Sequence, residues 1–306
     1  MPEPITALLV LLGAVAVLYG AVWFRHIRVA WKREPHELAG LPGPLLLGIG
    51  FVTDFLDTWG IGSYATTTAL FKFFKKCPDR LIPGTLNVGH GIPTIVQAFI
   101  FVAAVKVDPV TLISMIVAAV AGAWLGAGVV AGWDKRKIQI GMGLALAVAA
   151  VLLLRQQLAG DVKFSEDALG LVGGKFWIGV SVNFVLGALM TLGIGLYAPC
   201  MILVALLGMN ADAAFPIMMG SCAFLMPIAS YRFIQKESYA VKPAIALTIA
   251  GIPAVLAAVY LFKKTQIETI RWVVFGVVVY TSLMMLYSAF FAKDEDRIPA
   301  TAGTGN

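Results

Sequence analysis

Two carboxylates stand in an otherwise apolar stretch of this chain, and their spacing could support proton chemistry. Asp54 and Asp57 occur in "FVTDFLDTWGIGSYA", residues 51–65, and residues three apart on a helix lie on the same face. Two carboxylates that close can hold a shared proton more tightly than one alone. The alternative is that they cap the N-terminus of a neighbouring helix or pair with a loop lysine such as Lys72.

A histidine in the next segment could join the same proton chemistry. His90 stands in "PGTLNVGHGIPT", residues 83–94, together with Thr85 and Asn87. Histidine titrates near neutral pH, so His90 could relay a proton or donate a hydrogen bond to an anion. Asn87 precedes it by three residues and therefore lies on the same helix face. The alternative is a histidine that is simply hydrogen-bonded to a neighbouring helix.

The composition places these residues in a membrane protein. Of the 306 residues, 59% are hydrophobic and 13% are charged, with a mean hydropathy of +0.87, whereas soluble domains are roughly 45–50% apolar and about 25% charged. Apolar runs near the ~20 residues that span a bilayer recur along the chain, so no soluble catalytic domain fits. An ionisable side chain in such a span costs at least ~2.5 kcal/mol and is functional by default. We therefore expect coupling roles for Asp54, Asp57 and His90.

Several other classes of function are not supported by the sequence. The net charge of +6 does not indicate a nucleic-acid partner, because Lys and Arg are concentrated in short loops. Cys77, Cys200 and Cys222 are odd in number and widely spaced, which favours neither a disulfide framework nor a metal site. The sequence holds no Walker-type phosphate loop and no dinucleotide-binding fingerprint, so we expect neither a cofactor nor direct ATP drive.

The chain contains an internal repeat. Residues 51–65 match residues 184–198, "FVLGALMTLGIGLYA", at nine of fifteen positions, including both glycines of "GIG". A weaker match follows in the same order, where residues 84–85 correspond to residues 220–221. The repeat predicts four parts, which are an N-terminal transmembrane helix with a cytoplasmic linker (1–43), repeat 1 (44–155), a connecting loop (156–174), and repeat 2 with a short polar C-terminal tail (175–306).

Loop charge favours inverted over parallel repeats. Each repeat has one glycine-broken element and three apolar spans, at 85–104, 108–131 and 136–154 and again at 213–233, 241–262 and 270–291. If the broken element returns to its starting side, more Lys and Arg fall in the cytoplasm than if it crosses. The predicted fold class is an all-α integral membrane protein with two inverted-topology repeats, each a broken re-entrant helix pair plus three transmembrane helices, behind one extra N-terminal transmembrane helix. Its N-terminus would lie outside and its C-terminus in the cytoplasm.

The broken elements are where we expect a ligand. Half-helices at 44–56 and 63–74 would each reach the membrane midplane, and irregular backbone at that depth survives only beside protein or water. Two helix N-termini that face one cavity form an anion site without buried Lys or Arg. The alternative is that the glycines only let helices pack closely. The residues expected to bind a substrate are Thr58, Gly60, Gly62, Ser63, Tyr64, Thr66, Thr85, Asn87, Thr191, Gly193, Gly195, Tyr197 and Ser221.

These segments resemble the sulfite exporter TauE/SafE family, also called the toluene sulfonate uptake permease family. The resemblance rests on "GFVTDFLDTWGIGSYA", "IPGTLN", "NFVLGALMTLGIGLYAP" and "MMGSCAF", which stand where the family has loose glycine motifs. It implies a multi-pass transporter of the bacterial inner membrane, most often an exporter, for small sulfur-containing anions such as sulfite, thiosulfate or organosulfonates. By motif position it points to Gly60, Gly62, Gly193, Gly195, Thr85 and Ser221. Asp54 and Asp57 depart from the family pattern, which has small residues there, and this departure keeps proton or cation coupling open.

The function we predict is secondary transport of such an anion, bound at the midplane by half-helix N-termini and coupled to a proton through Asp54 and Asp57. The expected partners are the anion, the lipid bilayer and a coupling proton or cation, with a homodimer left open. One alternative is an anion channel, and another is a cation or divalent-metal transporter that uses Asp54, Asp57 and His90 as ligands. An intramembrane enzyme is disfavoured because the two aspartates share one helix.

Overall fold

Long helices run through the described part of the chain, and no strand occurs within it. The computed structural model describes residues 3–33, 42–126, 135–159, 168–190, 195–262 and 267–291. The α-helices are α1 (Glu3–Arg33), α3 (Pro44–Thr58), α4 (Ser63–Phe73), α5 (Ile82–Ala104), α6 (Pro109–Ala121), α8 (Lys135–Ala159), α9 (Gly173–Met190), α10 (Tyr197–Leu206), α11 (Ala214–Gln235), α12 (Val241–Phe262) and α13 (Ile267–Phe291).

The predicted apolar spans form helices at the predicted places. Within the described residues, five helices are long and apolar enough to cross a membrane, namely α1, α5, α9, α11 and α12. The second apolar span of repeat 1 begins as α6 and continues as a π-helical turn at Gly122–Gly126, and its last predicted residues, 127–131, lie outside the described ranges. The chain is therefore an all-α membrane protein at the level that helix length and composition establish.

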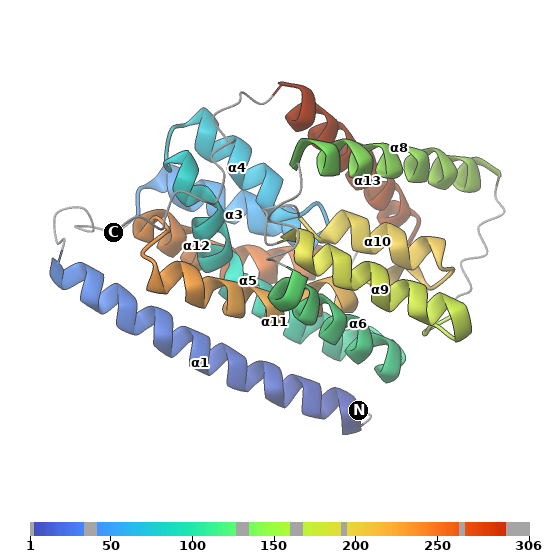
Figure 1. Cartoon of the computed structure of the whole chain (residues 1–306), viewed down its shortest axis with the longest axis horizontal. Helices are drawn as coiled ribbons and strands as arrows, with labels where there is room; N and C mark the ends of the chain where they lie inside the picture. Colours follow the sequence, from blue (N-terminus) through green and yellow to red (C-terminus); the bar gives the residue numbers. More distant parts are fainter. Residues whose placement is uncertain are drawn as a thin grey trace.

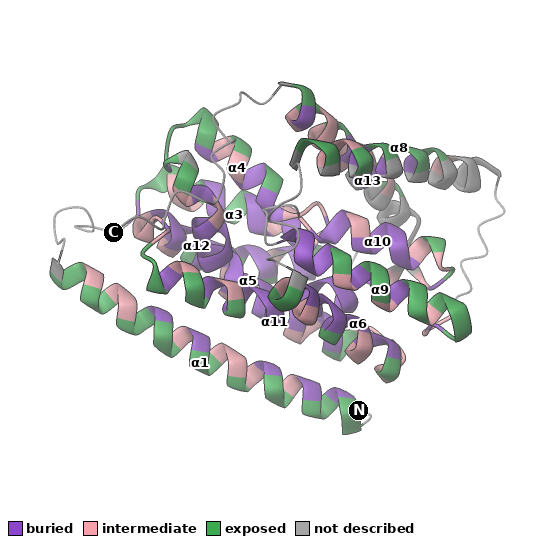
Figure 2. Cartoon of the chain, in the orientation of Figure 1, coloured by how far each residue is buried: buried purple, intermediate pink, exposed green. Residues whose placement is uncertain are grey.

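The helices pack in a pattern that puts two of them at the centre. Figure 1 shows α5 and α11 crossing the middle of the molecule, and α12, α6 and α1 pack against one or both of them. Helix α3 packs on α12, whereas α9 packs on α6, and α8 pairs with α13 along one edge. Buried residues concentrate in the central helices, and α1 lies at the edge with much of its surface exposed (Figure 2).

Glycines permit close crossings of α3 on α12 and of α9 on α6. A Cβ atom placed on Gly50 of α3 would lie 2.9 Å from the Cα of Leu247 in α12. A Cβ atom on Gly187 of α9 would overlap the carbonyl oxygen of Ala119 in α6. Small residues let helix backbones approach closely in membranes, where apolar surface alone gives little drive for helix association. The packing function considered for glycine in the sequence thus applies at Gly50 and Gly187.

Candidate functional site

The break predicted in the first repeat is confirmed. Helix α3 ends at Thr58 and α4 begins at Ser63. Between them Gly60 and Gly62 have φ angles of +90° and +83°, a region that side chains with a Cβ rarely adopt. The amide of Gly60 donates to the carbonyl of Asp57 at 2.8 Å and closes the last turn of α3. The chain therefore reverses at "GIG" because both glycines supply conformations that other residues resist.

The second "GIG" lies in the sequence between two described helices. Helix α9 ends at Met190 and α10 begins at Tyr197. Two predicted site residues, Thr191 and Gly193, lie outside the described residues. Gly195 is described, and a Cβ atom placed on it would meet nothing within 4 Å. The backbone of the second break is thus described only from Gly195 onward.

Both breaks meet at one small cavity. Its volume is about 20 Å³, room for a single water molecule, so the site is closed in this conformation. The first break contributes Gly62, Ser63 and Tyr64, and the second contributes Gly195 and Tyr197. The full lining is Asp57, Gly62, Ser63, Tyr64, Thr94, Met190, Gly195, Leu196, Tyr197, Cys222 and Met226.

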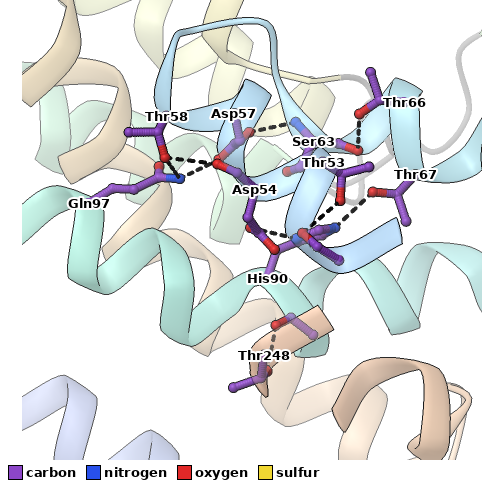
Figure 3. Close-up of polar contacts among 12 residues, drawn as sticks. Thr53, Asp54, Asp57, Thr58, Ser63, Thr66, Thr67, His90, Gln97 and Thr248 are labelled. Atoms are coloured by element: carbon purple, nitrogen blue, oxygen red, sulfur yellow. Dashed lines mark hydrogen bonds and ion pairs between the residues drawn. The ribbon is translucent and has the colours of Figure 1, made fainter. Parts of the chain in front are cut away.

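Asp57 holds the first turn of α4. Its Oδ1 accepts a hydrogen bond from the Ser63 amide at 2.5 Å, and its Oδ2 accepts one from Gln97 Nε2 at 3.0 Å (Figure 3). Gln97 Oε1 in turn accepts a hydrogen bond from the Tyr197 hydroxyl at 2.8 Å. For Asp57 the capping interpretation is therefore confirmed, and the carboxylate also links α3 through α5 to the start of α10.

Asp54 has a different partner from Asp57. Its Oδ1 lies 2.9 Å from His90 Nδ1, and His90 Nε2 lies 3.0 Å from the hydroxyl of Thr67 in α4 (Figure 3). Asp54, His90 and Thr67 are all fully buried. The helix face is shared, but each carboxylate bonds to its own partner. His90 makes the hydrogen bonds to neighbouring helices that the structural interpretation expected, and its role as a proton relay stays a prediction.

The second carboxylate oxygen of Asp54 occupies space that a glycine leaves open. Asp54 Oδ2 has no hydrogen-bond partner within the described part of the chain. It lies where a side chain at Gly251 would begin, and a Cβ atom there would also be 2.6 Å from Pro93 Cγ. The glycine of α12 therefore makes room for an aspartate that α3 directs toward it.

The other predicted residues of the first break bond to nearby backbone. Thr58 Oγ1 donates to the Asp54 carbonyl at 2.8 Å, and Thr66 Oγ1 donates to the Ser63 carbonyl at 2.9 Å. Such bonds to the preceding turn satisfy a hydroxyl inside its own helix. Thr58 also accepts a hydrogen bond from Gln97 Nε2 at 3.1 Å. Neither threonine is among the cavity-lining residues.

The predicted residues of the second segments lie away from the cavity. Thr85 Oγ1 donates to the Leu81 carbonyl at 2.7 Å and accepts a hydrogen bond from the Ala240 amide at 2.9 Å, at the start of α5. Asn87 Nδ2 donates to a carbonyl of its own helix at 2.9 Å. Ser221 Oγ accepts a hydrogen bond from Asn183 Nδ2 at 3.2 Å inside α11 and α9. Their substrate-binding role stays a prediction. Ser221 joins α11 to α9 and Thr85 joins α5 to the residue before α12, whereas Asn87 bonds within α5.

Sequence reasoning missed Gln97 and Thr94 of α5. Gln97 joins Asp57 to Tyr197, and Thr94 lines the cavity. A signal for both existed, because residues 90, 94 and 97 are spaced to lie on one helix face. Thr94 and Gln97, four and seven residues after His90, therefore lie on the same helix face as His90.

The ionisable side chains buried at the site are two carboxyl groups and one imidazole, and no buried Lys or Arg accompanies them within the described residues. These side chains are Asp54, Asp57 and His90. The same residues contain no group of three His, Cys, Asp or Glu side chains that could hold a metal ion. The three cysteines are free thiols. The arrangement can therefore hold protons, and it offers an anion backbone amides and hydroxyl groups.

Comparison of the chain with protein-family models, with curated proteins and with solved structures finds no match.

Proposed function

We propose that the chain is a secondary transporter of a small sulfur-containing anion, such as sulfite, thiosulfate or an organosulfonate, and that it binds this anion where the two helix breaks meet. The observation that carries this proposal is the cavity lined by Ser63 and Tyr64 of the first break and by Gly195 and Tyr197 of the second. A binding site between two discontinuous helices is the arrangement that secondary transporters with inverted repeats use. The resemblance of both breaks to the TauE/SafE family supports the same class of substrate and a bacterial inner membrane.

The packing of the helices supports an architecture of two related repeats. By sequence, α3 corresponds to α9 and α6 corresponds to α12. Helix α3 packs on α12 while α9 packs on α6, and the corresponding helices α5 and α11 pack on each other, as do α8 and α13. A two-fold axis that exchanges the repeats would produce this set of pairs. Two such halves can move against each other and open the cavity to either side of the membrane.

The residues that line the cavity support an anion with a polar and a less polar part. The lining includes Ser63, Tyr64 and Tyr197 together with the sulfur-containing side chains of Met190, Cys222 and Met226. Sulfur side chains are polarisable and apolar, so they suit the terminal sulfur of thiosulfate or the carbon side of an organosulfonate.

The alternatives are weaker on the same geometry. A channel needs a continuous polar path, whereas the cavity has room for one water molecule. A divalent-metal site needs carboxylate oxygens that converge, whereas Asp54 bonds to His90 and Asp57 bonds to Ser63 and Gln97. These partners leave the carboxylates directed away from a common centre.

A thermal-shift and uptake experiment tests the proposed function. Purified protein is screened with sulfite, thiosulfate, sulfate, taurine and sulfoacetate, and any stabilising anion is then used in uptake by proteoliposomes. Gly195→Val fills the cavity from a position with open space around it, so it should fold but lose binding. Gly48→Val is the matched control, because Gly48 is exposed on α3 and also has open space. A folded Gly195→Val protein that transports at the wild-type rate would contradict the proposed site.

A further inference from the structure

The Ser63 amide at the start of α4 could bind a substrate anion, but it already donates a hydrogen bond to an anionic group of the protein, the Asp57 carboxylate. The Asp57 carboxylate reaches forward six residues to the Ser63 amide, at 2.5 Å, and is 2% exposed. A carboxylate is favoured near a helix N-terminus for the same reason as a bound anion, since both meet free amide hydrogens and the positive end of the helix dipole. Asp57 and a substrate anion would therefore compete for the same donor.

The hydrogen bonds around Asp57 match an ionised carboxylate, because both of its oxygens accept from N–H groups. The Tyr197 hydroxyl donates to Gln97 Oε1, and this bond orients the amide so that Gln97 Nε2 donates to Asp57 Oδ2. The Ser63 amide donates to the other oxygen. An ionised carboxylate only accepts hydrogen bonds, whereas a protonated one carries a donor of its own. Protonation of either oxygen removes the negative charge and one acceptor site, so it weakens the hydrogen bonds from the Ser63 and Gln97 N–H groups.

Charge balance favours protonation of Asp57 when an anion enters the cavity. Asp54 is paired with His90, whereas Asp57 is bonded only to neutral donors, and no Lys or Arg is buried among the described residues. A second negative charge beside an ionised Asp57 would be costly, because buried charges need compensation. When Asp57 takes a proton as a singly charged anion such as a sulfonate enters, the buried charge is unchanged. One negative charge then moves from the side chain to the substrate.

A second polar group, the hydroxyl of Tyr64, could bind a ligand at the same cavity. Tyr64 lines the cavity and is 5% exposed, and its hydroxyl has no hydrogen-bond partner within the ranges that the structure describes. Buried hydroxyl groups are normally paired, and an exception asks for an explanation. Tyr64 is the residue after Ser63, so an anion bound to the Ser63 amide would lie beside the turn of α4 that carries Tyr64.

We propose that Asp57 is a tethered competitor of the transported anion, and that its protonation frees the N-terminus of α4 so that the anion and one proton bind together. This inference rests on the proposed function and adds its coupling ion and the residue that carries it. The proton comes from the aqueous side to which the cavity opens, and it leaves on the side where the anion is released. The titratable groups that face Asp57 are Asp54 of the same helix, Tyr64 of α4, His90 of α5, Tyr197 of α10 and Cys222 of α11.

The test measures anion binding against pH in the full chain. The probes are radiolabelled thiosulfate and methanesulfonate, whose charges stay constant between pH 5.5 and 7.5, and the protein is held in nanodiscs. One proton bound with each anion changes the affinity by about tenfold per pH unit, so wild-type binding should tighten by up to ~100-fold from pH 7.5 to 5.5. Asp57→Asn should bind with an affinity that does not change with pH.

Two variants separate Asp57 from its neighbours. Asp54→Asn keeps the Asp57–Ser63 bond and should keep the pH dependence of binding. Gln97→Met removes one donor from the ionised carboxylate and should extend tight binding toward higher pH, which provides a test even if Asp57→Asn does not fold. Equal pH dependence in wild type and Asp57→Asn, or its loss in Asp54→Asn alone, would overturn this inference and leave the proposed function standing. No binding of either anion by any folded form would overturn the proposed function and this inference with it.

Discussion

A methyl group added at Gly251 should break the Asp54–His90 pair, because the carboxylate occupies the space where that methyl group would lie. A Cβ atom at residue 251 would overlap Asp54 Oδ2 and would be 2.8 Å from Asp54 Cγ and 2.6 Å from Pro93 Cγ. Overpacking of a buried site costs about 1–3 kcal/mol, and loss of a hydrogen bond between charged groups costs about 1.5–3 kcal/mol. Gly251→Ala should therefore lower the free energy of unfolding by about 3–5 kcal/mol.

A double-mutant cycle isolates the contact with Asp54. In an Asp54→Ala background only the contact with Pro93 remains, so Gly251→Ala should cost about 2 kcal/mol less there than in wild type. Unfolding is followed by tryptophan fluorescence during titration of mixed micelles with SDS. Gly20→Ala in α1 is the control, because its added Cβ meets nothing within 4 Å, and it should be neutral or slightly stabilising. Equal losses for Gly251→Ala in both backgrounds would refute the reasoning.

Three further substitutions test separate parts of the site. Gly60→Ala imposes a Cβ at a φ of +90° and should destabilise the chain by about 1–3 kcal/mol, read from the same SDS titration. Tyr64→Phe removes a hydroxyl that has no partner within the described residues, so it should leave stability unchanged and weaken anion binding about 5- to 10-fold. Tyr197→Phe breaks the hydrogen bond to Gln97, so it should weaken anion binding and also lower the free energy of unfolding by about 1 kcal/mol. Thr85→Val removes the acceptor for the Ala240 amide in the loop between α11 and α12, so it should lower the free energy of unfolding by about 1–3 kcal/mol. An uptake KM equal to that of wild type would favour a structural role for Thr85, whereas a raised KM would favour substrate binding.

The features that sequence predicted best are those that local chain chemistry determines. The helix boundaries follow from apolar length, and α12 begins and ends at the predicted residues 241 and 262. The break at Gly60 and Gly62 follows from a glycine pattern that occurs twice, and its positive φ angles explain why glycine stands there. Neither feature depends on which other helix lies nearby.

The features that sequence could not predict depend on distant parts of the chain. Asp54 and His90 were each singled out, but their pairing requires α3 and α5 to cross at one place, and nothing in either segment fixes that crossing. Gln97 was missed because a single amide in an apolar span looks like a helix-packing residue until its neighbours are known. The reach of Asp57 to Ser63 depends on the shape of the turn between them, which the glycines permit but do not determine.

The two repeats are alike in packing but not in chemistry. In the second repeat the positions that correspond to Asp54 and Asp57 are Gly187 and Met190. Gly187 lets α9 lie directly on α6, whereas in the first repeat the aspartate fills the same place and Gly251 of the opposite helix supplies the space. Met190 has no strong acceptor with which to hold the start of α10. The starts of α4 and α10 thus meet at one cavity, but only α4 is held by a carboxylate of the preceding helix, which is why we expect one proton, and not two, to accompany each anion.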